Sequence, residues 1–383
     1  MTVPSAPLDD GTGEPLHLRI LQRLAEDDAA AGVSLPRLGK SLGQGASVLM
    51  RELSRMGDAV IGGSAGPGWA RLEQADGRWT AHLTAAGRAW LGAQARPEAE
   101  VACPPLAVHR VRVFGEPGAP PEGVDRNDTL AAEIPVALVF NGLSHAVMMA
   151  TPERLEDFAL GFALSEGILD SAADCRGITL QAVDGTVAQL PAGVPGIEVH
   201  LEISARCFER LRHRRRSMAG RTGCGVCGVE SFAALDLEPA RLPARDWLAR
   251  VDLPLVLRAM SGLHDLQPHN AQAGALHAAG WAGLDGRLQR VCEDVGRHNA
   301  LDKLIGALAR TQGLGQPGFV VLTSRGSHEL VRKCARVGIS ALATISAPTA
   351  TGVQVAELAG LRLWGLVRAP RGVLYAPGGA AVA

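Results

Sequence analysis

Lysine is scarce in this chain. Only Lys40, Lys303 and Lys333 occur, so arginine carries nearly all of the positive charge. The formal net charge is −1, which excludes a global electrostatic argument for binding nucleic acid or an anionic membrane. Any attraction for an anionic ligand must therefore come from a local group of basic residues.

Long apolar runs and a secretory leader are also missing. The longest candidate run, residues 339–367, is interrupted by polar residues, so no membrane-spanning helix is expected. The first 17 residues are acidic and proline-rich, which is not the pattern of a signal peptide. With 47% apolar and 20% charged residues, the composition is typical of a globular protein. We therefore expect a cytoplasmic protein with two or three domains.

Cysteine is too sparse for a disulfide framework, because seven residues form an odd and scattered set. Cys224 and Cys227 stand out, since they form a Cys-x-x-Cys pair within "GRTGCGVCGVES". The other five are expected to be ordinary small apolar residues; they are Cys103, Cys175, Cys207, Cys292 and Cys334.

The pair could be half of a zinc site, a dithiol switch or a carrier thiol. A structural zinc site needs four ligands, and the chain has no second Cys-x-x-Cys. A zinc deaminase has proline before its cysteine pair, whereas Gly223 stands here. The one His-x-Glu, at His200 and Glu202, lies in an expected strand upstream. Zinc binding and deamination are both disfavoured.

A run of arginines leads into the cysteine pair and favours a carrier thiol. These guanidinium groups would lower the pKa of a nearby thiol and would also attract phosphates. The flanking glycines suggest a mobile loop that carries a thiol between sites. A dithiol redox protein stays an alternative. The arginines are Arg210, Arg212, Arg214, Arg215, Arg216 and Arg221.

Residues 15–95 resemble a winged helix-turn-helix domain, with residues 45–57 in the position of the recognition helix. That helix offers only Arg51 and Arg55 as basic groups, and residues 15–95 hold nine basic and seven acidic residues. DNA binding and an interaction module both stay open. The proline-containing segment 96–107 is expected to be a linker.

Residues 108–205 are expected to form a small α+β subdomain. Alternating patterns predict strands at 109–115, 133–142, 145–151 and 196–204. A helix is predicted over 151–169, with Thr151 as its N-cap.

Residues 206–378 are expected to form an α/β subdomain. Apolar runs alternate with amphipathic helices from residue 285 onward, which predicts a mostly parallel sheet covered on both faces. Segments 293–299, 323–327 and 345–349 should meet at one edge, where helices begin. Ser324, Arg325 and Ser327 could hold a phosphate there, or Ser327 could cap a helix. His298 and Asp302 are one helical turn apart, which predicts a pair.

Long motifs at 134–169, 214–231, 292–308 and 321–377 resemble the FdhD/NarQ family, the formate dehydrogenase accessory sulfurtransferases. The resemblance covers roughly residues 108–378. It implies a cytidine-deaminase-like three-layer α/β core with the smaller α+β subdomain, preceded here by the winged-helix-like domain. It also implies a homodimer.

The resemblance further implies a sulfurtransferase, or stoichiometric sulfur carrier, in which a cysteine desulfurase passes sulfur to Cys224 as a persulfide. Cys227 has a secondary role. The sulfur would go to the molybdenum (or tungsten) bis-molybdopterin guanine dinucleotide cofactor, which is delivered to formate dehydrogenase. No intrinsic metal is implied. The alternative is a winged-helix transcriptional regulator with a domain that senses this cofactor. The cofactor-binding segment maps to Leu366, Val367, Arg368, Ala369, Pro370 and Arg371, with Arg221, Ser324, Arg325 and Ser327 as weaker candidates.

Overall fold

The protein forms two compact units, Met1–Ala99 and Glu100–Ala383, in a computed structural model. The structure describes residues 16–26, 32–58, 60–61, 64–65, 67–75, 77–94, 103–115, 117, 120, 122–183, 190–191, 193–216 and 239–379. Within these ranges, no helix has both the length and the apolar character needed to cross a bilayer.

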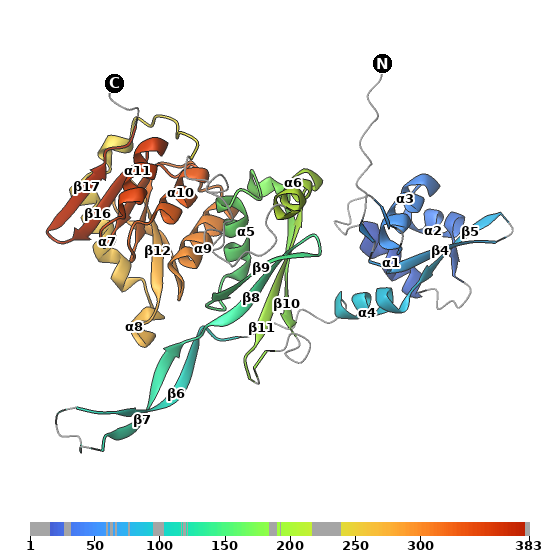
Figure 1. Ribbon diagram of the computed structural model, residues 1–383, viewed down its shortest axis with the longest axis horizontal. Helices are drawn as coiled ribbons and strands as arrows, with labels where there is room; N and C mark the ends of the chain where they lie inside the picture. Colours follow the sequence, from blue (N-terminus) through green and yellow to red (C-terminus); the bar gives the residue numbers. More distant parts are fainter. Residues whose placement is uncertain are drawn as a thin grey trace. The chain divides into compact units, whose positions relative to one another are not determined.

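The first unit combines helices with a small antiparallel sheet in the order β1-β5-β4 (Figure 1). Ile20, Leu21 and Leu24 recur at helical spacing and are buried together with Leu38 and Leu49. The helix expected at 45–57 is present as α3. The elements are α1 (Leu16–Glu26), β1 (Val33–Ser34), α2 (Leu35–Leu42), α3 (Ala46–Met56), β2 (Val60–Ile61), β3 (Ser64–Ala65), β4 (Ala70–Ala75), β5 (Arg78–Leu83) and α4 (Ala85–Gln94).

The second unit contains a four-stranded sheet, a six-stranded sheet and a separate hairpin (Figure 1). Its first half comprises β6 (Leu106–Val113), β7 (Val124–Ala131), β8 (Ile134–Phe140), β9 (Leu143–Ala150), α5 (Leu155–Ser165), η1 (Ala172–Asp174), β10 (Cys175–Val183), β11 (Gly196–Ile203) and α6 (Ala205–Arg216). Its second half comprises η3 (Leu248–Arg250), α7 (Leu253–Asp265), α8 (Asn270–Ala273), β12 (His277–Ala282), β13 (Leu288–Asp294), α9 (Arg297–Arg310), β14 (Phe319–Leu322), α10 (His328–Arg336), β15 (Ala341–Thr344), α11 (Ala350–Ala359), β16 (Arg362–Arg368) and β17 (Arg371–Ala376).

The small sheet has the order β10-β11-β8-β9, with β11 and β8 parallel. Two expectations for this region are corrected. The strand predicted at 109–115 is β6, which pairs with β7 in the separate hairpin, and β10 takes a place in the sheet instead. The predicted helix begins at Leu155, not after Thr151. Thr151 is buried, and its backbone N–H donates to Asp294, so it connects two elements and does not cap α5.

The large sheet has the order β13-β12-β14-β15-β16-β17. Only β14, β15 and β16 pair in parallel; β12 and β17 are antiparallel to their neighbours. The expectation of a mostly parallel sheet is therefore wrong, because residues 277–282 insert a reversed strand that the sequence pattern did not reveal. Both faces are buried: Val320 and Leu322 pack in one core with α9, α10 and α11, while Phe319 and Val321 pack with α7.

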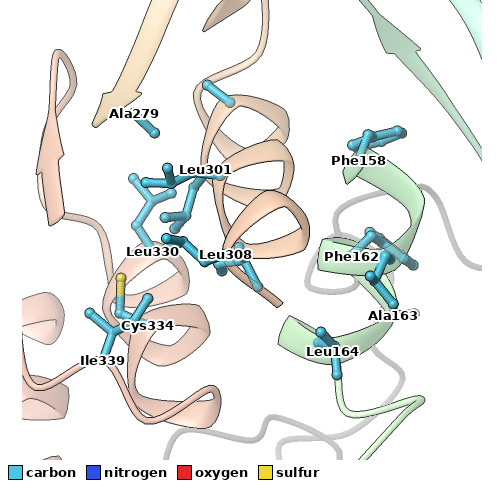
Figure 2. Close-up of a cluster of buried hydrophobic side chains, with 14 of the residues drawn as sticks. Phe158, Phe162, Ala163, Leu164, Ala279, Leu301, Leu308, Leu330, Cys334 and Ile339 are labelled. Atoms are coloured by element: carbon cyan, nitrogen blue, oxygen red, sulfur yellow. The ribbon is translucent and has the colours of Figure 1, made fainter. Parts of the chain in front are cut away.

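The two sheets of this unit are joined by the packing of α5 against α9 (Figure 2). The two helices approach very closely at two glycines. A Cβ on Gly161 would lie 1.7 Å from the carbonyl oxygen of Asp302, and a Cβ on Gly306 would lie 1.9 Å from that of Asp157. Phe158 and the other apolar side chains around this crossing form one continuous core with the small sheet and the helices of the large sheet.

Candidate functional site

Four strands of the large sheet end at the same edge. β13, β14, β15 and β16 run in one direction, because β12 is antiparallel to both β13 and β14, and β15 is parallel to its two neighbours. Segments 293–299, 323–327 and 345–349 therefore follow strand ends at one edge, as predicted. β12 runs the other way, so its first residue, His277, also lies here, opposite Asp294. We call this region the strand-end edge.

The segment expected to bind the cofactor ends β16 and turns into β17. Leu366 is half-buried, and its backbone N–H donates to the Ser346 carbonyl at 3.2 Å, while Val367 is fully buried. The exposed part of the segment is the turn at the strand-end edge. It consists of Arg368, Ala369, Pro370 and Arg371.

Arg368 and Arg371 lie directly opposite each other in the register of β16 and β17. Like charges in this position repel each other. The Nε of Arg368 donates to the Ile345 carbonyl at 3.3 Å, and neither guanidinium has a carboxylate partner among the described residues. An anion bound between the two arginines would relieve the repulsion.

An open pocket of about 210 Å³ lies beside this turn. Side chains of α7 form one wall, and the ends of β15 and β16 form the other. The first wall consists of Leu257, Met260 and Ser261, and the second of Ile345, Val367, Arg368 and Ala369.

The weaker candidates lie two strands away, at the end of β14. Ser324 is buried, and its Oγ donates to the Arg325 carbonyl at 3.2 Å. Arg325 is exposed and has no described carboxylate partner. Ser327 occupies the N-cap position of α10, but its hydroxyl makes no capping bond and is buried without a described partner. The helix-capping alternative for its side chain is therefore wrong.

His298 pairs with a residue that the sequence did not indicate. Its Nε2 lies 3.0 Å from Oε2 of Glu329 on α10, and this contact lowers the pKa of the Glu329 carboxyl. Asp302 instead faces α5 and α10, where it accepts hydrogen bonds from Ser165 at 2.7 Å and Lys333 at 2.9 Å. The predicted pair of His298 and Asp302 is wrong, because these neighbours on one helix turn toward different elements.

Asp294 fixes the loop that begins α9. Its buried carboxylate accepts from the backbone N–H of Thr151 at 3.0 Å and of Gly296 at 2.8 Å. It also accepts from Asn299 at 2.9 Å and lies 2.7 Å from Nζ of Lys303. These contacts tie the end of the small sheet to the strand-end edge and hold the first turn of α9 in place.

Cys224, Cys227 and Arg221 lie outside the described residues. The helix that precedes them, α6, is held at its start by ion pairs: Arg206 and Arg210 both contact Asp170, and the Arg210 contact is 2.9 Å. These arginines lower the pKa of Asp170, with Arg210 contributing most.

The action of the upstream arginines on the cysteine pair stays a prediction, but two of these arginines have carboxylate partners of their own. Arg210 is engaged with Asp170, and Arg212 contacts Glu209 at 2.9 Å. Their charges are already compensated within α6 and its neighbours. The structure does not describe the side chains of Arg214, Arg215 and Arg216.

The five cysteines outside the pair are ordinary packed residues. Burial raises the pKa of Cys292 to about 11 and that of Cys334 to about 12. It also raises the pKa values of Cys103 and Cys175, which are partly buried. Cys207 is fully buried. A thiol that stays protonated is a poor nucleophile. The four cysteines with a raised pKa are therefore unsuited to sulfur transfer at neutral pH.

A model of the FdhD/NarQ family matches residues 131–380. A sulfur carrier protein FdhD from Burkholderia cenocepacia is 50% identical over 237 residues, covering 62% of this chain and 83% of that protein. One from Bordetella petrii is 47% identical over 273 residues, covering 71% and 92%.

A crystal structure from Desulfotalea psychrophila, of a protein assigned as a formate dehydrogenase accessory protein, has 21% identity and a TM-score of 0.49. It covers 73% of this chain and 98% of that one. The family match spans well over half of the present sequence and includes the cysteine pair, the strand-end edge and the segment 366–371. The chain therefore belongs to the FdhD/NarQ family.

Proposed function

We propose that this protein is a sulfur carrier that supports formate dehydrogenase. The observation that carries the proposal is 50% identity over 237 residues to a protein named sulfur carrier protein FdhD. Cys224 accepts the terminal sulfur of a cysteine desulfurase persulfide, and the desulfurase cysteine leaves as a thiolate. Cys227 has a secondary role. The S–S bond of the Cys224 persulfide then breaks, Cys224 leaves as a thiolate, and the terminal sulfur passes to the bis-molybdopterin guanine dinucleotide cofactor of molybdenum. This cofactor is bound as a substrate, and its reduced metal would supply the two electrons that convert the sulfur to sulfide.

The state of the other cysteines supports the assignment of Cys224. Sulfur transfer between thiols requires an accessible thiolate. Burial holds Cys292 and Cys334 in the protonated form, and it raises the pKa values of Cys103 and Cys175.

The arginines of the strand-end edge support binding of a phosphate-containing cargo. Arg325, Arg368 and Arg371 are exposed, and none has a carboxylate partner among the described residues. Arginine binds phosphate oxygens through two parallel hydrogen bonds, so these groups fit a pyrophosphate-linked nucleotide. The cofactor would be held by Leu366, Val367, Arg368, Ala369, Pro370 and Arg371, with Ser324, Ser327 and Arg221 as further contacts.

The remaining parts of the proposal concern architecture and partners. The large sheet with helices on both faces is compatible with a cytidine-deaminase-like core. The order of α1, α2, α3 and the β4–β5 hairpin is compatible with a winged helix. The protein acts in the cytoplasm, as a homodimer, with a cysteine desulfurase and formate dehydrogenase as partners.

A cofactor-sensing transcriptional regulator is the second candidate. It is favoured by one observation: α3 exposes Arg51 and Arg55 on one face, where a recognition helix would contact DNA. Arg55 also contacts Glu52 at 3.5 Å, which reduces the charge available for phosphates.

The test is intact-mass spectrometry after incubation with a cysteine desulfurase and cysteine. The wild-type protein should gain one sulfur atom, and Cys224→Ala should gain none because the accepting thiolate is gone. Cys103→Ala is the matched control and should be labelled like the wild type.

Labelling that persists in Cys224→Ala would overturn the assignment of Cys224. If the wild-type protein takes no sulfur, the sulfur-carrier proposal fails. A mobility-shift assay with the protein's own upstream DNA, comparing wild type with Arg51→Ala, would then decide the regulator alternative.

A further inference from the structure

A second group of basic side chains lies at the strand-end edge, away from segment 366–371. His277 begins β12, and its Nδ1 lies 3.5 Å from Oγ1 of Thr323 at the end of β14. Arg297 and His298 form the first turn of α9. His277 lies opposite Asp294 in the register of β12 and β13, and Arg297 and His298 follow Asp294 by only three and four residues, so the three basic residues occupy one local region. The sequence placed segment 293–299, which contains Arg297, at this edge, but it did not indicate His277 as part of an anion site.

Arg297 gives this cluster a positive charge that is incompletely compensated. Glu329 is the nearby carboxylate, but it is engaged with His298 at 3.0 Å. Asp294 is surrounded by four donors of its own, including Lys303 at 2.7 Å. Arg297 is left without an ion-pair partner among the described residues. The titratable and charged groups around the cluster are His277 of β12, Asp294 of β13, Arg297 and His298 of α9, and His328 and Glu329 of α10.

Two helices begin at this cluster without a side-chain cap. α9 starts after Gly296, and the Ser327 hydroxyl makes no capping bond to α10. By contrast, Asp252 caps α7 at 3.1 Å and Thr349 caps α11 at 3.1 Å. Uncapped N–H groups in a first turn attract negative charge, and here they add to the charge of the side chains. The Ser327 Oγ, buried without a described partner, is a further potential donor.

We propose that His277, Arg297 and His298 form a second oxyanion subsite, which binds a phosphate group of the same ligand whose other end contacts Arg368 and Arg371. This inference rests on the proposed function, because it assumes a cargo with several phosphates. Glu329 is a positioning residue that orients His298.

The spacing of the strands fits a single extended ligand. β12 and β16 are separated by β14 and β15, so their ends are about 14 Å apart at roughly 4.8 Å per strand. A compact anion cannot reach both groups, whereas a nucleotide linked through a pyrophosphate can extend along the edge. His277 adds a dependence on pH. Burial, followed by Arg297 and His298, lowers the pKa of His277, and a bound anion would raise it again.

The first experiment is calorimetric titration of the full chain with inorganic pyrophosphate at pH 6 and pH 8. Binding should be several-fold tighter at pH 6, since a bound anion favours protonation of the His277 imidazole. Arg297→Gln should weaken binding at least tenfold, as expected for loss of a charge-assisted contact. Arg287→Gln is the matched control, because this arginine is 86% exposed at the opposite end of β12 and β13. It should bind like the wild type.

The subsite would be overturned if Arg297→Gln bound pyrophosphate as tightly as the wild type while its thermal unfolding curve was unchanged. Equal weakening by Arg287→Gln would also overturn it, because the effect would then be non-specific. His277→Gln provides a second variant if Arg297→Gln does not fold, and it should remove most of the difference between pH 6 and pH 8.

The second experiment separates one extended ligand from two small-anion sites by titrating GDP. If one ligand spans the edge, Arg297→Gln and Arg368→Gln should each weaken GDP binding. If Arg297→Gln binds GDP as tightly as the wild type, the subsite serves free phosphate and the shared-ligand part of the proposal is wrong. Sulfur labelling of Cys224 is read independently, so failure of the sulfur-carrier function and failure of the subsite are distinguishable.

Discussion

Glu166 joins α5 to α10 through two basic residues. Its carboxylate lies 2.8 Å from Nζ of Lys333 and 2.8 Å from Arg332. Burial alone would raise the pKa of Glu166, but Lys333 and Arg332 outweigh it and lower the pKa from 4.5 to about 2. A carboxyl whose pKa is depressed in the folded state contributes stability above its unfolded pKa, and this stability is lost as the pH falls through the folded value.

Glu166→Gln should therefore destabilise residues 100–383 at pH 7 by up to about 3 kcal/mol, the free energy that corresponds to this shift. Between pH 4.5 and 2 the wild-type protein should lose more stability than the variant, so the two curves should converge. Urea unfolding at a series of pH values measures this. Glu202→Gln, at an exposed carboxylate of β11, is the control and should leave the curve unchanged. Parallel curves for Glu166→Gln and wild type would contradict the prediction.

At the scale of single residues, the sequence predicted positions correctly only where chain direction decides them. Segments 323–327 and 345–349 were placed correctly because strand ends meet at one edge. The partner of His298 could not be predicted, since Glu329 is 31 positions away on another helix and Asp302 offered an equally good local spacing. The roles of Cys224 and segment 366–371 stay predictions.

The crossing of α5 and α9 depends on glycine at two positions. Gly306→Ala would place a Cβ 1.9 Å from the Asp157 carbonyl oxygen, which is backbone and cannot move by itself. The helices must separate, and overpacking of this kind costs about 1–3 kcal/mol or more. Thermal unfolding should therefore show a clear loss of stability.

Gly262→Ala in α7 is the matched control for this substitution. Its Cβ would meet only a Leu288 methyl group at 3.7 Å, an ordinary contact. Alanine is a better helix former than glycine by about 1 kcal/mol, so the control should be neutral or stabilising. Equal melting temperatures for the two variants would show that α5 and α9 do not pack as closely as described.

At the scale of elements, helices with strong periodicity were predicted well, whereas the sheet was not. β12 has the sequence HAAGWA, in which small residues hide the alternation that marks a strand. β12 lies between β13 and β14 in the sheet and is antiparallel to both. Because this strand was not predicted, the sheet was expected to be mostly parallel. The start of α5 was misplaced because Thr151 is a good N-cap residue that is used instead in a long-range contact.

The whole molecule has separate cores in its two units. Leu38 is fully buried in the first unit, and Leu304 is fully buried in the second. Each Leu→Ala substitution removes buried methyl groups and should cost about 2–5 kcal/mol in its own unit. Calorimetry should show that Leu38→Ala lowers one unfolding transition and Leu304→Ala the other. A single transition that shifts equally in both variants would contradict separate unfolding.

The contact between Thr151 and Asp294 has a consequence for synthesis on the ribosome. The two residues are 143 positions apart, a length that takes roughly 7–30 s to translate at about 5–20 residues per second. During this time the first unit can already fold, because its core needs nothing beyond residue 99. The small sheet and α5 cannot complete their core in the same way, because part of it is formed by α9. The side of α5 that carries Gly161 stays exposed until α9 has been made, so the nascent chain presents this apolar surface while residues 166–310 are being added.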